Sequence, residues 1–226
     1  MLKAVLFDLD NTLYDNSKQV HSAREKAVIA MISAGLGGRK KDVMKVLEAV
    51  VSKKGSNYPH HYDELVKSIS AGENPAIVAA GVMAYHKTKQ KYLRPYPEVV
   101  KTLRMIKGMG LRLGVVTDGV PVKQWEKLIR LGFADVFDAV IVSPDEREHK
   151  PSPKPFLKAA KKLGIPPKDC LVVGDRADRD ILGGNRAGMA TALVVRKGQE
   201  APKSFGKGQE PDYILQSLSD VVKIIR

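Results

Sequence analysis

The feature that most constrains the fold is a regular alternation of strand-like and helix-like segments from residue 94 onward. Short runs rich in Val, Leu and Ile alternate with segments whose apolar residues recur at helical spacing. Parallel strands need such helical crossovers, and the helices then cover both faces of the sheet. The sequence therefore predicts an α/β protein with a doubly wound parallel sheet. The expected strands are 3–7, 111–117, 139–143, 170–174, 191–195 and 213–215.

A second region, residues 16–93, contains no convincing strand. It reads as a compact bundle of about four helices, because its apolar residues recur at helical spacing between Gly-rich or Pro-containing breaks. We therefore expect an all-helical domain at 16–93, inserted into a discontinuous α/β core made of 1–15 and 94–226. Within the insert the expected helices are 17–34, 39–53, 64–70 and 75–92. Within the core they are 97–108, 121–132, 153–164, 178–187 and 218–225, and 196–211 is expected to be a mobile surface loop.

Polar residues follow the expected strands where each one ends. Asp8 and Asp10 follow the first strand, and Thr117 ends the second, with Asp118 and Gly119 after it. The loop after the third strand carries Lys150, and Asp175 and Asp180 follow the fourth. Because the carboxyl ends of parallel strands meet at one edge, we expect these side chains to form one site. Two buried carboxylates as close as Asp8 and Asp10 require a cation, and Mg²⁺ suits a site of few carboxylates, waters and a phosphate.

The stretch from Asp8 to Thr12, Asp-Leu-Asp-Asn-Thr, resembles the first motif of the haloacid dehalogenase-like superfamily, most of whose members are phosphatases. Thr117, Lys150 and the Gly174-Asp175 to Asp180 stretch are similar to the second, third and fourth motifs, in order. The helical insert corresponds to the family's type 1 cap. The resemblance covers essentially the whole chain and implies a Rossmann-like core.

The resemblance also implies roles for these residues. Asp8 would be the nucleophile that forms an aspartyl-phosphate, and Asp10 would act as general acid and then general base. Lys150 would neutralise charge beside Asp8 and the phosphate. Mg²⁺ would be held by Asp8, the backbone carbonyl of Asp10 and Asp175, with Asp180 orienting its waters. Substrate contacts would come from Thr12, Thr117, Asp118, Gly119 and Lys150.

Several assignments have competitors in the sequence. Lys154 or Arg147 could replace Lys150, and Asp178 could replace Asp180. Asp118 stands where the family more often has Asn, and Arg176 where a small residue is common, which leaves substrate orientation open. The single Trp, Trp125, is expected to pack within a core helix.

The implied activity is hydrolysis of small phosphate monoesters, such as glyceraldehyde 3-phosphate or phosphoglycolate. A sugar phosphomutase would use the same residues, whereas 2-haloacid dehalogenases have Tyr where this chain has Asp10. A net charge of +13 leaves a nucleic-acid or phospho-partner binding protein as a non-enzymatic alternative. The lysines, however, are scattered through amphipathic helices, and paired acids would repel phosphates.

Composition sets further expectations. The only cysteine is Cys170, in a buried-strand context, and no intrachain disulfide can form. No apolar run approaches the ~20 residues of a membrane span, and no signal peptide is recognisable. We expect a cytoplasmic protein, either a monomer or a homodimer, without a membrane or nucleic-acid partner.

Overall fold

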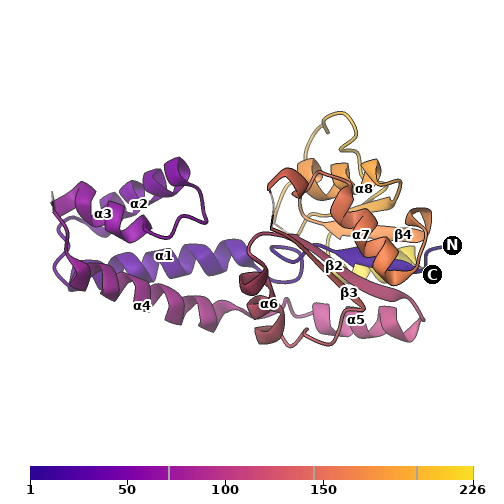
Figure 1. Cartoon of the computed structure of the whole chain (residues 1–226), viewed down its shortest axis with the longest axis horizontal. Helices are drawn as coiled ribbons and strands as arrows, with labels where there is room; N and C mark the ends of the chain where they lie inside the picture. The colour runs from indigo at the N-terminus through magenta and orange to yellow at the C-terminus, as the bar shows by residue number, and fades with distance from the viewer. Residues whose placement is uncertain (71, 145, 197, 226) are drawn as a thin grey trace. The chain divides into compact units, whose positions relative to one another are not determined.

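The structure is a computed structural model of the chain, and it describes residues 1–70, 72–144, 146–196 and 198–225 (Figure 1). The chain divides into two compact units. One unit consists of Met1–Asp15 with Arg94–Arg226, and the other is Asn16–Leu93. The first unit contains the sheet, and the second contains only helices among its described residues.

The sheet has six strands, all parallel, in the order β3-β2-β1-β4-β5-β6. This confirms the predicted doubly wound α/β class. The direction of strand addition reverses between β1 and β4, so the topological switch point lies at their carboxyl ends. The strands are β1 (Ala4–Phe7), β2 (Arg112–Asp118), β3 (Ala139–Ser143), β4 (Cys170–Gly174), β5 (Ala190–Val194) and β6 (Tyr213–Leu215).

Helices cover both faces of the sheet, which explains why β1 and β4 are buried along their whole length. On one face, α7 (Lys154–Leu163) packs across β1, β2 and β3 (Figure 1). Its buried Phe156 belongs to an apolar cluster with Leu6 of β1 and Val172 of β4. Cys170 lies in the same cluster and is fully buried, as expected from the sequence. The other core helices are α5 (Val99–Gly108), α6 (Pro121–Arg130), α8 (Leu182–Arg186) and α9 (Val221–Ile224).

Two predicted helices of the core differ in the structure. In place of one helix over 178–187, a π-helical turn at Ala177–Ile181 leads into the short α8. In place of one helix over 218–225, a 3₁₀ turn at Leu218–Asp220 precedes α9. Helical spacing of apolar residues cannot distinguish these wider and tighter turns from an α-helix.

Asp138 ties the start of β2 to the segment that leads into β3. Its Oδ2 accepts a hydrogen bond from the backbone amide of Leu113 at 2.8 Å, and its Oδ1 accepts one from Arg112 at 3.1 Å. Burial raises the pKa of Asp138, but these hydrogen bonds more than offset it and leave the pKa below its usual value. The ionised carboxylate therefore stabilises the folded chain.

Helix α6 buries Gln124 and Leu128, and its opposite face is apolar but exposed. Trp125 is 40% exposed, on the same side as Val122 and Ile129. The expectation that Trp125 packs inside the core is therefore wrong. Periodicity identifies an apolar stripe but does not show whether another element covers it.

The helical unit contains α1 (Asn16–Ser33), α2 (Lys40–Lys54), α3 (His61–Ser70) and α4 (Pro75–Tyr92). Its core includes Met31 of α1, Leu47 of α2 and Leu65 of α3. Helices α1 and α4 approach closely at Gly81, where an added Cβ would stand 2.7 Å from the Met31 side chain. Asn74 caps α4 by accepting a hydrogen bond from the Ile77 amide at 3.2 Å.

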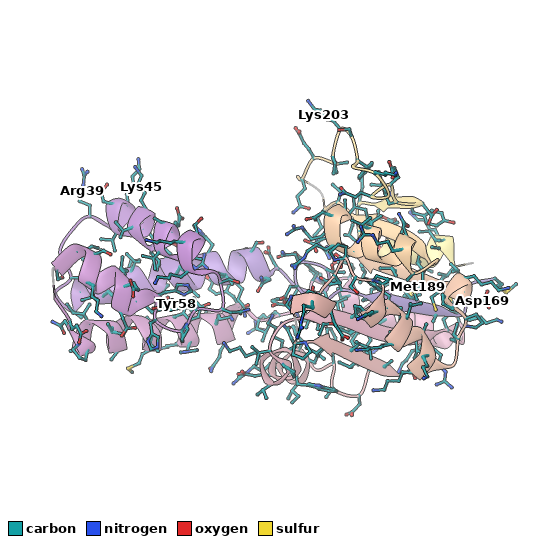
Figure 2. All side chains as sticks on the ribbon, turned by 45° about the horizontal axis from the view of Figure 1, so that its top comes forward. Arg39, Lys45, Tyr58, Asp169, Met189 and Lys203 are labelled. Carbon is teal, nitrogen blue, oxygen red and sulfur yellow. The ribbon has the colours of Figure 1, made fainter. Side chains whose placement is uncertain are left out.

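The helical unit carries exposed basic side chains on its surface. Arg39 and Lys45, on the outer side of the unit, extend into solvent (Figure 2). Among the described residues, no helix is long and apolar enough to cross a membrane.

The last part of the 196–211 segment of the core is tied to α8. The side-chain amide of Asn185 donates to the carbonyls of Gly208 and Glu210, both at 2.9 Å. Residue 197 lies outside the described residues, and the mobility of the loop stays a prediction.

Candidate active site

Asp8 lies directly after β1, in the centre of the sheet. Its amide donates to the carbonyl of Val173 at 2.9 Å, which extends the β1–β4 pairing by one residue. Its carboxylate is buried and accepts a hydrogen bond from the Thr12 hydroxyl at 3.3 Å. The backbone of Asn11 has φ 63°, in the left-handed region that Asn tolerates, and turns the chain back so that Thr12 faces Asp8.

Lys150 reaches the same point from the loop after β3. Its ammonium donates to Asp8 Oδ1, to Asp180 Oδ1 at 2.7 Å and to the carbonyl of Val116 at 3.2 Å. The side chain is only 5% exposed. Burial alone would lower the pKa of Lys150, but the carboxylates of Asp180 and Asp8 outweigh it and raise this pKa above its usual value. Lys150 is therefore a fully charged group inside the protein.

Asp8, Asp175 and Asp180 form a compact acidic cluster, because one oxygen from each lies within 4.8 Å of the others. Burial raises the pKa of Asp8 well above its usual value, in spite of Lys150, with Asp180 and Asp175 adding to the rise. Burial and the neighbouring Asp180 also raise the pKa of Asp175 to about 6. The cluster therefore has more negative charge than Lys150 balances. Three oxygen donors short of positive charge fit Mg²⁺, a hard cation that prefers carboxylates and water.

The π-helical turn places Asp180 in this cluster. Asp180 N and Ile181 N both hydrogen-bond to the carbonyl of Arg176, and Asp180 Oδ2 accepts from the Arg176 amide at 3.1 Å. Gly174, the last residue of β4, makes the close approach possible. An added Cβ at Gly174 would stand 2.3 Å from Asp180 Cγ.

The structure separates the competing residues that the sequence left open. Asp178 forms a two-contact ion pair with Arg176, at 2.8 and 2.7 Å, and does not belong to the acidic cluster. Lys154 is exposed and lies 3.7 Å from Glu148. Asp180 and Lys150 are thus the residues next to Asp8.

The other predicted site residues lie around this centre. Thr117 is buried at the end of β2. Asp118 Oδ1 accepts from the backbone amide of Lys150 at 3.3 Å, which holds the Lys150 loop. Gly119 has φ 123° and its amide donates to the carbonyl of Ser143 at 3.0 Å, so this amide is already engaged.

The carboxylate of Asp10 is held by two residues that were not among the expected site residues. Lys127 of α6 donates to both of its oxygens at 2.7 Å, and the Tyr14 hydroxyl donates to Oδ1 at 2.5 Å. Lys127 lies 117 residues further along the chain, on a helix that also carries exposed Lys123. Nothing in the sequence distinguishes these two lysines. Tyr14 lies two residues after the motif stretch, and its spacing of four residues from Asp10 was the one available signal.

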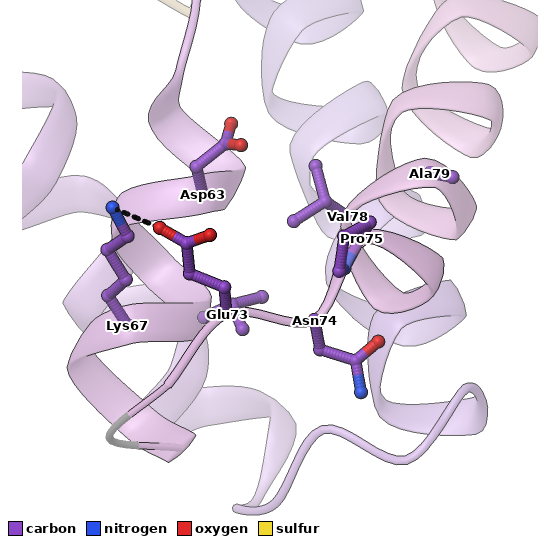
Figure 3. A pocket seen from close by; sticks show the side chains of 8 residues that line it. Asp63, Lys67, Glu73, Asn74, Pro75, Val78 and Ala79 are labelled. Atoms are coloured by element: carbon purple, nitrogen blue, oxygen red, sulfur yellow. Dashed lines mark ion pairs between the residues drawn. The ribbon is translucent and has the colours of Figure 1, made fainter.

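A hollow of about 240 Å³ lies on the helical unit, between α3 and the start of α4 (Figure 3). Its charged side chains are Asp63, Glu73 and Lys67, and Lys67 already pairs with Glu73 at 2.9 Å. With an excess of carboxylates and its lysine engaged, this hollow is poorly suited to a phosphate.

Comparison with known proteins gives a consistent result over the whole chain. The profile of the haloacid dehalogenase-like hydrolase family matches residues 2–188. A glyceraldehyde 3-phosphate phosphatase of Methanopyrus kandleri is 44% identical over 100% of this chain and 98% of its own length. A phosphoglycolate phosphatase of Aquifex aeolicus is 31% identical over 99% of this chain and 97% of its own. The crystal structure of a phosphatase of this family from Thermococcus onnurineus superposes with a TM-score of 0.71, at 26% identity, covering 99% and 98% of the two chains. The chain therefore belongs to the haloacid dehalogenase-like hydrolase family.

Proposed function

We propose that this protein is a Mg²⁺-dependent phosphatase of small phosphate monoesters, with glyceraldehyde 3-phosphate as its leading substrate. The observation that carries the proposal is the buried contact of Lys150 with Asp8 and Asp180, beside Asp175 at the topological switch point. Glyceraldehyde 3-phosphate is suggested by the glyceraldehyde 3-phosphate phosphatase that is 44% identical over the full chain. Phosphoglycolate is the second candidate substrate, because a phosphoglycolate phosphatase is 31% identical.

A phosphate dianion that approaches the Asp8 carboxylate to ~4 Å meets roughly 8 kcal/mol of repulsion at an effective dielectric near 20. Lys150 offsets part of this repulsion because its ammonium contacts the attacking carboxylate directly. Asp8, Asp175 and the carbonyl of Asp10 would hold Mg²⁺, with Asp180 orienting its waters, and the ion would supply the remaining positive charge. The same positive charge keeps Asp8 ionised, as a nucleophile must be, although burial raises its pKa.

The two halves of the reaction follow from the chemistry of the two aspartates. An Asp8 oxygen forms a bond to phosphorus while the bond from phosphorus to the substrate oxygen breaks, and Asp10 gives its proton to that leaving oxygen. Water then forms a bond to phosphorus, the bond from phosphorus to Asp8 breaks, and Asp10 takes a proton from the water. The products are the alcohol and inorganic phosphate, and both aspartates are restored.

The remaining site residues would bind or organise the phosphate. Thr117, at the end of β2, would donate to a phosphate oxygen, and Thr12 would keep Asp8 oriented through its hydroxyl. Asp118 would help to place Lys150 beside the phosphate, because its carboxylate accepts a hydrogen bond from the Lys150 backbone amide. Gly119 would contribute the turn after β2, which its positive φ permits. We further propose that residues 16–93 serve as the family's cap and that the protein is cytoplasmic.

The test is phosphate release from a panel of small phosphate esters, with Mg²⁺ and with a chelator. We expect metal-dependent turnover that Asp8→Asn abolishes, with glyceraldehyde 3-phosphate among the best substrates. Asp178→Asn is the control, since Asp178 follows β4 as Asp175 and Asp180 do but pairs with Arg176 outside the cluster. Turnover that persists in Asp8→Asn would refute the assignment of Asp8 as the nucleophile.

The same panel separates the alternatives. Chloride release from chloroacetate without metal would favour a 2-haloacid dehalogenase, and a rearranged sugar phosphate would favour a phosphomutase. Tight, salt-dependent binding of nucleic acid with no turnover would favour the binding-protein alternative.

A further inference from the structure

The carboxylate of Asp10 is held in a defined orientation by side chains from two other parts of the core. Lys127 Nζ lies 2.7 Å from each of the two oxygens, so it bridges the carboxylate from its open side. The Tyr14 hydroxyl adds a third hydrogen bond at 2.5 Å, to Oδ1. Three hydrogen bonds to its two oxygens leave the carboxylate little freedom to rotate about its terminal torsion.

The rest of α6 explains why Lys127 points at Asp10. Leu128 is buried beneath the helix, and the Gln124 side chain donates to the carbonyl of Asp118 at 2.9 Å, which fixes the rotation of the first turns. Lys127 is 14% exposed and its ammonium lies 5.9 Å from the centre of the Tyr14 ring. A lysine this far from solvent loses much of its hydration and is retained where a carboxylate compensates it. Lys123, one turn earlier, is exposed.

We propose that Lys127 is a positioning residue for Asp10, and that Tyr14 assists it. This inference rests on the proposed function, in which Asp10 donates a proton to the leaving oxygen. A general acid must come within about 2.6–3.2 Å of that oxygen, and small errors of placement are costly. Lys127 acts through the orientation of Asp10 and makes no contact with substrate.

Leaving-group dependence tests this role, because proton donation matters in proportion to the basicity of the leaving oxygen. The experiment compares kcat/KM for glyceraldehyde 3-phosphate, whose leaving group is a primary alcohol, with kcat/KM for p-nitrophenyl phosphate, whose leaving group is a far more acidic phenol. This parameter reports the steps up to the departure of the alcohol, so slow release of phosphate does not mask the effect.

For Lys127→Met we expect kcat/KM on glyceraldehyde 3-phosphate to fall about tenfold, as part of the 10²–10⁴-fold typical of general acid catalysis. On p-nitrophenyl phosphate we expect a change of less than about threefold. Tyr14→Phe, which keeps the buried ring, should shift the ratio in the same direction by about threefold. Lys123→Met, on the same helix, should leave both substrates unchanged, and thermal unfolding of each variant checks that it is folded.

A double-mutant cycle shows whether Lys127 works through Asp10. In an Asp10→Asn background, Lys127→Met should have no further effect on glyceraldehyde 3-phosphate. An equal loss on both esters in folded Lys127→Met, or a full additional loss in the Asp10→Asn background, would overturn the inference. An increase in activity would also overturn it, because Lys127 would then be holding Asp10 away from the reaction.

The proposed function and this inference fail in different ways. Absence of metal-dependent turnover in the unmodified protein refutes the proposed function. Normal turnover with an unchanged ratio of the two kcat/KM values in Lys127→Met refutes only the role of Lys127.

Discussion

Replacing Lys150 by Met should destabilise the folded core strongly, and the loss should depend on pH. Met keeps the length and the apolar stem of the side chain but removes the ammonium. The change leaves Asp8 and Asp180 buried, with side chains only 9% and 2% exposed, and without their cation.

The magnitude follows from the contacts. At the 2.7 Å between Lys150 Nζ and Asp180 Oδ1, the attraction is about 6 kcal/mol for an effective dielectric near 20. Part of this attraction offsets the several kcal/mol needed to bury the ammonium. Removing one member of a buried ion pair costs about 3–5 kcal/mol, because the remaining charge is uncompensated. For a chain of this size each kcal/mol corresponds to about 2–4 °C in the melting temperature.

The pH dependence has a definite sign. Burial already raises the pKa of Asp8, and loss of Lys150 raises it further, so the folded mutant binds a proton more readily than the unfolded chain. The deficit of Lys150→Met should therefore be larger at pH ~8 than at pH ~5, because protonation of Asp8 removes part of the uncompensated charge as pH falls.

Urea and thermal unfolding at these two pH values, in a chelator, measure the effect. Lys154→Met is the matched control, because Lys154 is 63% exposed and its contact with Glu148 is 3.7 Å, so its loss should cost less than about 1 kcal/mol. A loss in Lys150→Met as small as in this control, or one that does not change with pH, would refute the reasoning.

Three further predictions concern the metal, the fold of the site and the surface. Mg²⁺ at about 100 times its dissociation constant should stabilise the protein by about 2.7 kcal/mol in a thermal-shift assay. Asp175→Asn should remove this stabilisation, whereas Asp178→Asn should keep it. Equal stabilisation of the two variants would contradict the assignment of the acidic cluster as the metal site. Gly174→Ala should cost about 1–3 kcal/mol by calorimetry, since its Cβ would stand 2.3 Å from a buried acidic side chain, whereas Gly108→Ala, with nothing within 4 Å, should be neutral or slightly stabilising. Asp138→Asn should cost up to about 1 kcal/mol at neutral pH. Because the folded pKa of this group is lowered, the difference should shrink as pH falls toward that value, and a difference in urea unfolding as large at pH ~3 as at neutral pH would contradict it.

Much of the site was predictable because a parallel sheet brings the carboxyl ends of its strands to one edge. Asp8 after β1 and Asp175 after β4 are adjacent for this reason alone, since β1 and β4 pair in register. Lys150 was expected there on the same grounds. These predictions needed only the strand periodicity and the positions of the polar residues.

Local backbone geometry and helix rotation were not predictable in the same way. The choice of Asp180 over Asp178 depends on a π-helical turn, whose apolar spacing resembles that of an α-helix. Trp125 was expected to pack but is exposed, because coverage of an apolar stripe depends on elements distant in sequence.

The sequence by itself determined the fold class through local periodicity, and the order and spacing of its motifs indicated the family and brought Asp8 and Asp175 to one edge of the sheet. Only the tertiary structure decided that Lys127 rather than Lys123 bridges Asp10. That contact joins residues 117 positions apart and depends on the rotation of α6 against the sheet. Packing of the helix against the core sets this rotation, and the residue spacing within the helix does not predict it.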